Sequence, residues 1–231
     1  MEIETQRLLI RDVKTEDKIP FVQMAADGSL NDCGFDRDCG NWITKWIDET
    51  RGFAFRDNPN TDYLAYTITL KAEAAVIGSI GCSYYEDLRE TGITYFIGAQ
   101  YRDNGYAVEA VKAYTDYYLN HYNAKRIIAT VRDENISSWK VIEKVGFILN
   151  EKRMYKDLND DDEKLYRFYE ITKNRDNGWL TGRLFFNRED KRVIIKRPRS
   201  GFGYTMNLGN KWTWIFCIIF VIIIVILVSA L

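Results

Sequence analysis

Residues 101–110 read YRDNGYAVEA and decide the fold, because they join the apolar run ITYFIG at 93–98 to a long helical pattern. The apolar run predicts a strand, and apolar positions three and four residues apart predict a helix over 105–122. A loop between them presents backbone N–H groups without intrahelical partners at the positive end of the helix dipole. Gly105 allows close backbone approach, and Ala107 adds little bulk. The stretch predicts either a plain turn or a phosphate cradle.

The residues around this loop show the alternation of strands and helices expected of one α/β domain ending near residue 173. Three successive strands before the loop are separated by short turns, which favours an antiparallel meander. Gly146 follows the last helical pattern and is a typical C-terminal residue for a helix. The expected strands are 2–13, 62–70, 74–85, 91–98, 125–132, 147–155 and 164–172, and the other expected helices are 14–26, 38–50 and 136–147.

A second motif gives the loop a specific meaning. Residues 135–147, NISSWKVIEKVGF, read N-x-x-S-x-x-V-x-x-K-x-G-F, about 30 residues after R-x-x-G-x-A at 102–107. Together the two motifs resemble the acyl-CoA-binding core of GNAT superfamily N-acetyltransferases. TQRLLIRDVKTED at 5–17 is similar to the start of the branch that includes ribosomal-protein N-terminal acetyltransferases. The resemblance covers roughly residues 3–172. It implies an α/β (α+β) fold with a mixed, mostly antiparallel twisted sheet and a splayed central strand pair.

The resemblance also implies acetyl-CoA as co-substrate, with no metal. The diphosphate would lie on the amides of the loop, and the pantetheine arm would pair with the strand before it. Asn135 and Ser138 have a second interpretation as helix-capping residues, and both roles are compatible. The expected cofactor-binding residues are Phe96, Ile97, Arg102, Asn104, Gly105, Tyr106, Ala107, Asn135 and Ser138.

Acyl transfer to an amine needs a base for the ammonium proton and an acid for the departing thiolate. Many family members place a tyrosine acid four residues after the Ser138 position, where this chain has Ile142, so we expect Ser138 to replace it. Where many members carry a glutamate base, this chain has Gly92. Glu90 lies on the same strand face two residues earlier and is the expected base through water, or else a solvated carboxylate. Glu151 is a second candidate.

These features predict an N-acetyltransferase acting on a primary amine: a protein N-terminus, a polyamine or another small amine. The departures at Gly92 and Ile142 keep an alternative open, a catalytically degenerate acetyl-CoA-binding sensor or scaffold that regulates a membrane partner. Residues 1–174 contain 23 Lys or Arg and 30 Asp or Glu, a net charge of −7. This charge suits a cationic amine, and solubility would explain it equally well.

Cysteine and histidine usage argues against a structural metal site. Cys33, Cys39, Cys82 and Cys217 form no CxxC pair, and their spacing from His121 does not match a zinc motif. We expect reduced thiols of an intracellular protein. His121, near a helix C-terminus, is expected to complement the helix dipole at the surface.

Residues 174–211 predict a small basic module after the main domain. Residues 175–211 contain nine Lys or Arg and three Asp or Glu. F-x-N-x-x-D-x-R-x-x-x-K-R followed by G-x-G-Y-T-x-N is similar to a short bacterial module of unknown function. We expect RLFFN and RVIIKR to form a hairpin, with YTMNL as a third strand; a disordered basic linker is the alternative.

Residues 212–231 read WTWIFCIIFVIIIVILVSAL and predict a transmembrane helix, because a helix of this length covers about 30 Å. The basic segment before it predicts a single-pass protein of the cell membrane with a cytoplasmic catalytic domain, and contacts between basic residues and lipid. No secretory signal is evident at the N-terminus. Nothing in the pattern indicates base recognition, so no nucleic-acid partner is expected.

Overall fold

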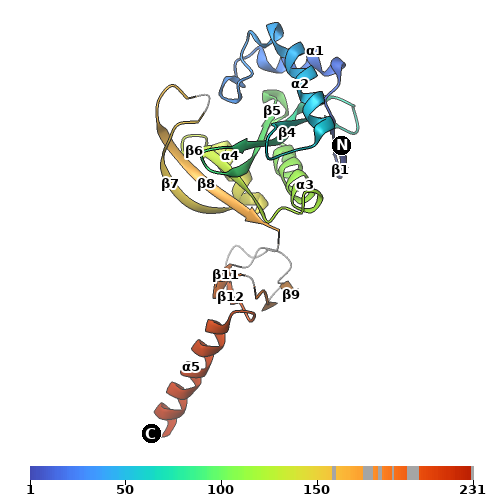
Figure 1. The fold of residues 1–231 in the computed structure, drawn as a ribbon. Helices are drawn as coiled ribbons and strands as arrows, with labels where there is room; N and C mark the ends of the chain where they lie inside the picture. Colours follow the sequence, from blue (N-terminus) through green and yellow to red (C-terminus); the bar gives the residue numbers. More distant parts are fainter. Residues whose placement is uncertain (158–159, 174–178, 182–183, 189, 197–202, 230–231) are drawn as a thin grey trace. The chain divides into compact units, whose positions relative to one another are not determined.

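The computed structural model describes residues 1–157, 160–173, 179–181, 184–188, 190–196 and 203–229. The chain divides into two compact units, Met1–Thr172 and Lys173–Leu231. The colours of Figure 1 follow the chain through both units.

The elements of the first unit follow the expected order of strands and helices, but the helix expected over 38–50 lies later in the chain, as α2 at Ile43–Arg56. The strands are β1 Glu2–Glu4, β2 Leu8–Asp12, β3 Leu64–Leu70, β4 Val76–Tyr85, β5 Glu90–Ile97, β6 Arg126–Arg132, β7 Ile148–Tyr155 and β8 Lys164–Thr172. The helices are α1 Lys18–Ala25, α2 Ile43–Arg56, α3 Tyr106–His121 and α4 Ile136–Val145.

The strands of this unit form one mixed sheet in the order β1-β2-β3-β4-β5-β6-β8-β7. Every neighbouring pair is antiparallel except β5 and β6, which are parallel. The single strand expected over 2–13 is instead a hairpin of β1 and β2. Its turn is closed by Thr5, whose amide donates to Leu8 O and whose hydroxyl oxygen accepts from Leu8 N, both at 2.9 Å, so a local hydrogen-bonding side chain overrides the alternation.

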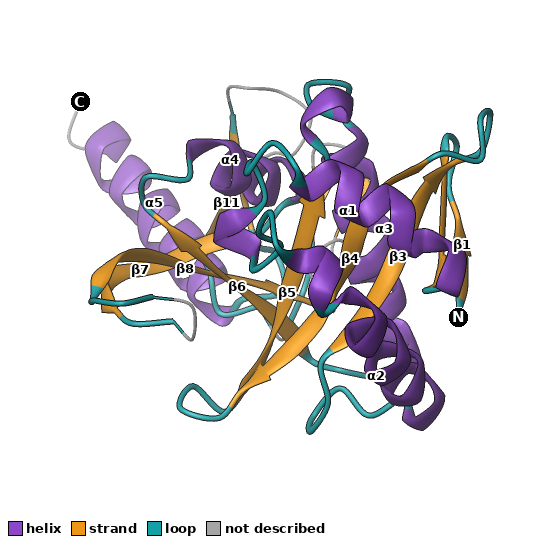
Figure 2. Ribbon diagram, turned by 90° about the horizontal axis from the view of Figure 1, so that it is seen from above, coloured by secondary structure: helices purple, strands orange, loops and turns teal. Residues whose placement is uncertain are grey.

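Helices cover both faces of the sheet and create two cores. One core joins α3 and α4 to the sheet through fully buried side chains such as Ile10, Tyr66, Val111 and Ile142. The other joins α1 and α2 to the opposite face through residues such as Phe21, Ile43 and Phe96. Figure 2 shows α1 and α2 lying across β3 and β4. The edges and ends of the strands therefore remain as the places where a ligand can approach.

The second unit pairs its short strands differently from the expected hairpin. β9 Trp179–Thr181 pairs with β10 Leu184–Phe185, and β11 Ile194–Lys196 pairs with β12 Tyr204–Met206. Thus the segment RLFFN pairs with residues before it rather than with RVIIKR. The buried side chain of Asn207 explains part of this arrangement, because it donates to Asn187 O and Asp190 O, both at 2.8 Å.

The prediction of a membrane-spanning C-terminus is wrong. The last element is α5, Lys211–Ser229. Within the described residues, no helix has both the length and the apolar character needed to cross a membrane. This finding contradicts the expected transmembrane helix at 212–231 and the single-pass membrane localisation. It also removes the basis for the lipid contacts deduced from them.

Candidate active site at the opening between β5 and β6

A wedge opens where the two parallel strands separate. In the described chain β5 and β6 pair at one position, Gly92 with Ile128, near the start of both strands. β5 continues to Ile97 and β6 to Arg132 without further pairing. Since the strands run in the same direction, both C-terminal halves border the same opening. This is the splayed pair that the resemblance implied.

Backbone groups of β5 face this opening. Gly98 N donates to Ile77 O of β4 at 2.9 Å, and alternate residues of an antiparallel strand face the same neighbour. Phe96 therefore turns its backbone toward β4, whereas Tyr95 and Ile97 turn theirs toward the wedge. The ring of Phe96 is buried beside Phe35, with 4.8 Å between ring centroids, so this side chain supports the strand from the α1–α2 face.

The loop after β5 exposes a row of donors. Asp103 and Gly105 have φ of 62° and 77°, and α3 begins directly afterwards at Tyr106. No described residue accepts a hydrogen bond from the backbone N–H groups of residues 104–107. The first amide with a partner in this turn is Glu109 N, which donates to Gly105 O at 3.2 Å. Unpaired amides at the positive end of a helix fit a diphosphate.

Arg102 holds the loop in place with its side chain. Its Nε donates to Ile97 O at 3.0 Å, and its Nη2 donates to Ser29 O at 3.2 Å in the segment after α1. Asn104 Nδ2 donates to Arg102 O at 2.8 Å and closes the turn from within. Two of the expected cofactor-binding side chains are thus used to shape the loop, and the backbone amides are its outward-facing donors.

Arg7 and Glu109 support the loop from behind, a contact that the sequence analysis did not anticipate. Arg7 Nη1 donates to Asn104 O at 2.9 Å, and Arg7 Nη2 lies 2.7 Å from Glu109 Oε2. Thr5 Oγ1 also donates to Glu109 Oε1 at 2.6 Å. Burial acts to raise the pKa of Glu109, but the hydrogen bonds from Thr5 and Arg7 outweigh it and hold the pKa below its usual value. No spacing rule links residues 102 positions apart.

The two expected residues of α4 lie at its N-terminus. Asn135 Oδ1 accepts from Ser138 N at 3.1 Å, so Asn135 does cap the helix. The Ser138 hydroxyl lies 2.9 Å from the Tyr95 hydroxyl, which reaches it from β5. Ile142, where many family members have a tyrosine, is fully buried in the core. Tyr95 was not among the expected site residues. Its position in the alternating run ITYFIG indicates on which face of the strand its side chain lies, but not which residue that side chain contacts.

The expected base Glu90 lies at the closed end of the strand pair. It forms an ion pair with Arg126, which also contacts Glu170 at 3.1 Å. At Gly92, a Cβ atom would lie 2.6 Å from the Tyr85 ring, so an aromatic ring fills the space that a side chain at this position would need. Burial raises the pKa of Tyr85 to about 12. The other candidate, Glu151, forms an ion pair with Arg153 at 3.0 Å on β7.

The far side of the wedge is fixed by Arg132 at the end of β6. Its guanidinium contacts Asp32 at 2.8 Å in the segment after α1, and it also pairs with the fully buried carboxylate of Asp160. Tyr166 donates to the same carboxylate at 2.6 Å. Burial acts to raise the pKa of Asp160, but the bond from Tyr166 and the charge of Arg132 keep it lowered. This network joins three segments around the opening.

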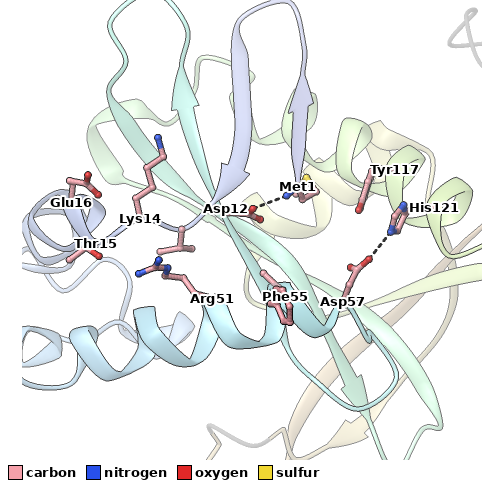
Figure 3. A pocket seen from close by; sticks show the side chains of 12 residues that line it. Met1, Asp12, Lys14, Thr15, Glu16, Arg51, Phe55, Asp57, Tyr117 and His121 are labelled. Atoms are coloured by element: carbon pink, nitrogen blue, oxygen red, sulfur yellow. Dashed lines mark hydrogen bonds and ion pairs between the residues drawn. The ribbon is translucent and has the colours of Figure 1, made fainter.

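A separate cavity lies at the other end of α3 (Figure 3). Its volume is about 930 Å³, and its walls come from the segment after β2, the second half of α2 and the end of α3. His121 Nε2 lies 2.7 Å from Asp57 Oδ2, and the Tyr117 ring stacks on His121 at 4.7 Å. Tyr106 and His121 are roughly 22 Å apart along the helix axis, so this cavity is distinct from the wedge. Among the residues described, no cluster of His, Cys, Asp or Glu is arranged to hold a metal ion.

Comparison with known proteins identifies the same domain. The family description "Acetyltransferase (GNAT) domain" matches residues 7–148. The uncharacterized N-acetyltransferase YnaD of Bacillus subtilis (strain 168) is 28% identical over 149 residues, which are 63% of this chain and 82% of that protein.

Solved structures give the same fold. The GNAT-family acetyltransferase from Bacillus anthracis has a TM-score of 0.64 at 21% identity, over 76% of this chain and 100% of that one. RimL, the ribosomal L7/L12 alpha-N-protein acetyltransferase in complex with coenzyme A, has a TM-score of 0.64 at 14% identity, also over 76% and 100%. Identities this low show likeness of fold alone.

Proposed function

This chain belongs to the GNAT acetyltransferase family, and on that premise we propose that it transfers an acetyl group from acetyl-CoA to a primary amine. The observation that carries the proposal is the row of unpaired amides at residues 104–107, directly beside the opening between β5 and β6. These amides would bind the diphosphate of CoA. The alternative, a plain turn, would be compatible with the unpaired amides but would give no reason for the open strand pair beside them.

The residues present fit the rest of the cofactor. The backbone groups of Tyr95 and the amide of Ile97 face the opening and would pair with the pantetheine arm in the manner of an added strand, whereas the Ile97 carbonyl already accepts from Arg102. At Gly105 a Cβ would have one neighbour within 4 Å, Arg7 Nη2 at 3.5 Å, so the backbone surface is accessible here. Asn135 and Ser138 border the far end of the arm. Acetyl-CoA supplies an activated thioester, and the protein supplies alignment of the thioester with the amine.

For proton transfer we propose that a water molecule takes the proton of the attacking amine and passes it to the carboxylate of Glu90. Glu90 lies on the same face of β5 as Gly92, one strand repeat away. Its ion pair with Arg126 holds the carboxylate in place. The acceptor we propose is a protein N-terminus, a polyamine or another small amine, in keeping with the acidic charge of residues 1–174.

The full-length protein tests this function directly. Release of free thiol from acetyl-CoA is followed with a panel of N-terminal peptides, polyamines and small amines, and CoA affinity is measured by calorimetry. Gly105→Glu is expected to abolish CoA binding without unfolding the protein. Gly105→Gln is the matched control, because both residues strain the backbone at φ 77° and only Glu adds a negative charge. Equal CoA affinity in the two variants would contradict the diphosphate assignment.

A further inference from the structure

The Tyr95 hydroxyl connects the two sides of the wedge. Tyr95 belongs to β5 and Ser138 to the first turn of α4, yet their hydroxyl oxygens lie 2.9 Å apart. The Tyr95 hydroxyl is also 3.1 Å from the Ser138 carbonyl oxygen. Since the backbone of Tyr95 faces the opening, this contact lies where the thioester end of CoA would enter. A tyrosine that only packed against α4 would not need its hydroxyl on this serine.

Counting protons limits what the pair can do. Each hydroxyl has one proton, and the Ser138 carbonyl oxygen can only accept. If Tyr95 donates to the carbonyl, Ser138 can donate to Tyr95 and has no proton left for a ligand. If Tyr95 donates to Ser138 Oγ, the Ser138 proton is free to point into the wedge. A negative sulfur atom in the wedge favours the second arrangement, because it attracts a donor.

Burial keeps Tyr95 available as a hydrogen-bond donor. It raises the pKa of Tyr95 well above its ordinary value, so the phenol stays protonated at neutral pH and remains a donor. The same shift makes Tyr95 a poor source of a transferable proton. Ser138 and Tyr95 are both partly exposed, and the proton count makes the serine the hydroxyl that is left to meet a ligand.

We propose that Tyr95 is a positioning residue that donates to Ser138 Oγ and thereby directs the Ser138 hydroxyl proton at the sulfur of CoA. The inference rests on the proposed function. In the transfer the amine lone pair forms the C–N bond, the C–S bond breaks with its electron pair on sulfur, and the nitrogen loses its proton to water. Ser138 stabilises the negative sulfur by a hydrogen bond, and the sulfur takes its final proton from water. Tyr95 takes over part of the task of the tyrosine that Ile142 replaces.

The test measures the thiol pKa of CoA bound to the full-length protein, from the ultraviolet absorbance of the thiolate across a pH series. A hydrogen bond to a charged group should lower this pKa by about one unit in the wild type, a tenfold rise in the thiolate-to-thiol ratio. Tyr95→Phe and Ser138→Ala should each remove most of that shift. The double variant should be no worse than Ser138→Ala alone. Tyr84→Phe, which removes a hydroxyl elsewhere in the sheet, should keep the shift.

Desulfo-CoA separates positioning from a purely structural role. It lacks the sulfur atom, so its affinity should be the same for wild type and Tyr95→Phe, whereas a damaged site would lose affinity for both ligands. A wild-type shift that persists in folded Tyr95→Phe overturns the inference. If Tyr95→Phe does not fold, a wild-type shift that persists in Ser138→Ala overturns it instead. CoA binding with no shift in the wild type refutes this inference alone, and absence of CoA binding refutes the proposed function as well.

Discussion

Gly92 and Ile128 are the one pair at which β5 and β6 meet along the described strands. This pairing, near the start of both strands, determines where the sheet opens. On the closed side the sheet is continuous, and on the open side the backbone of Tyr95 and the Ile97 amide face the opening. The position of a single residue pair therefore places the opening at the middle of the sheet.

The Tyr85 ring over Gly92 predicts that even a methyl group at this position is costly. Gly92→Ala would bring a Cβ to 2.6 Å from the ring, which a packed aromatic cannot avoid by a small movement. We expect the free energy of unfolding to fall by about 1–3 kcal/mol in a urea titration. Gly52→Ala in α2 is the control, because its Cβ would meet nothing within 4 Å. That substitution should stabilise the protein by about 0.5–1 kcal/mol. Equal effects at both sites would refute the packing argument.

Loss of Arg7 should weaken CoA binding through the charge of Glu109. Arg7→Met keeps the aliphatic stem but leaves the Glu109 carboxylate uncompensated in the first turn of α3, beside the diphosphate amides. Calorimetry should show roughly fivefold to tenfold weaker binding of CoA. Adding Glu109→Gln removes the uncompensated charge and should restore most of the affinity. If the double variant binds no better than Arg7→Met, the electrostatic explanation is wrong.

The hydrogen bonds of the Asp17 carboxylate should make the folded protein less stable in acid. This carboxylate accepts from Arg11 at 2.7 and 2.8 Å, from Lys14 N at 2.9 Å and from Thr67 Oγ1 at 2.7 Å. Burial acts to raise its pKa, but these four hydrogen bonds outweigh it, so the folded pKa is lowered. A lowered folded pKa contributes stability above the unfolded pKa of about 3.9, and this contribution is lost as pH falls through the folded pKa.

Asp17→Asn tests this directly by urea titration at several pH values. At pH 7 the variant should lose about 3–5 kcal/mol, because the largely buried Arg11 keeps its charge without a partner. The gap to the wild type should narrow below about pH 4. Glu16→Gln, at the exposed neighbouring position, should change stability by less than about 0.5 kcal/mol at every pH. A gap that does not depend on pH would show that Asp17 acts by shape alone.

Asn207 should hold the second unit together. It is fully buried; beside its two donations, its Oδ1 accepts from Asn187 N at 2.9 Å and Gly209 N at 3.0 Å. Asn207→Asp replaces two donors by an acceptor, which should cost about 3 kcal/mol or more. Hydrogen exchange should then accelerate within Lys173–Leu231 and not within Met1–Thr172. Lys191→Gln, an exposed substitution in the same unit, should leave exchange unchanged.

The agreement between sequence and structure follows the range of the interactions involved. The helix over 105–122 and the strand over 91–98 are recovered within two residues, because periodicity and the glycines at their ends act locally. The expected strand over 2–13 failed because Thr5 bends it with two local hydrogen bonds that alternation does not reveal. The pairing of RLFFN failed because several short apolar runs can pair in several ways, and the buried amide of Asn207 contributes to the choice.

The sequence by itself determined the order of elements, the position of the loop at 101–110 and the family, because motif residues and apolar spacing are properties of neighbouring positions. The tertiary structure alone decided which backbone amides remain unpaired, that Arg7 meets Glu109, that Tyr85 covers Gly92, and that Tyr95 reaches Ser138. Arg7 and Glu109 are 102 positions apart and Tyr95 and Ser138 are 43 positions apart. Their approach depends on how the sheet opens and how the helices pack on it, and no local pattern contains that information.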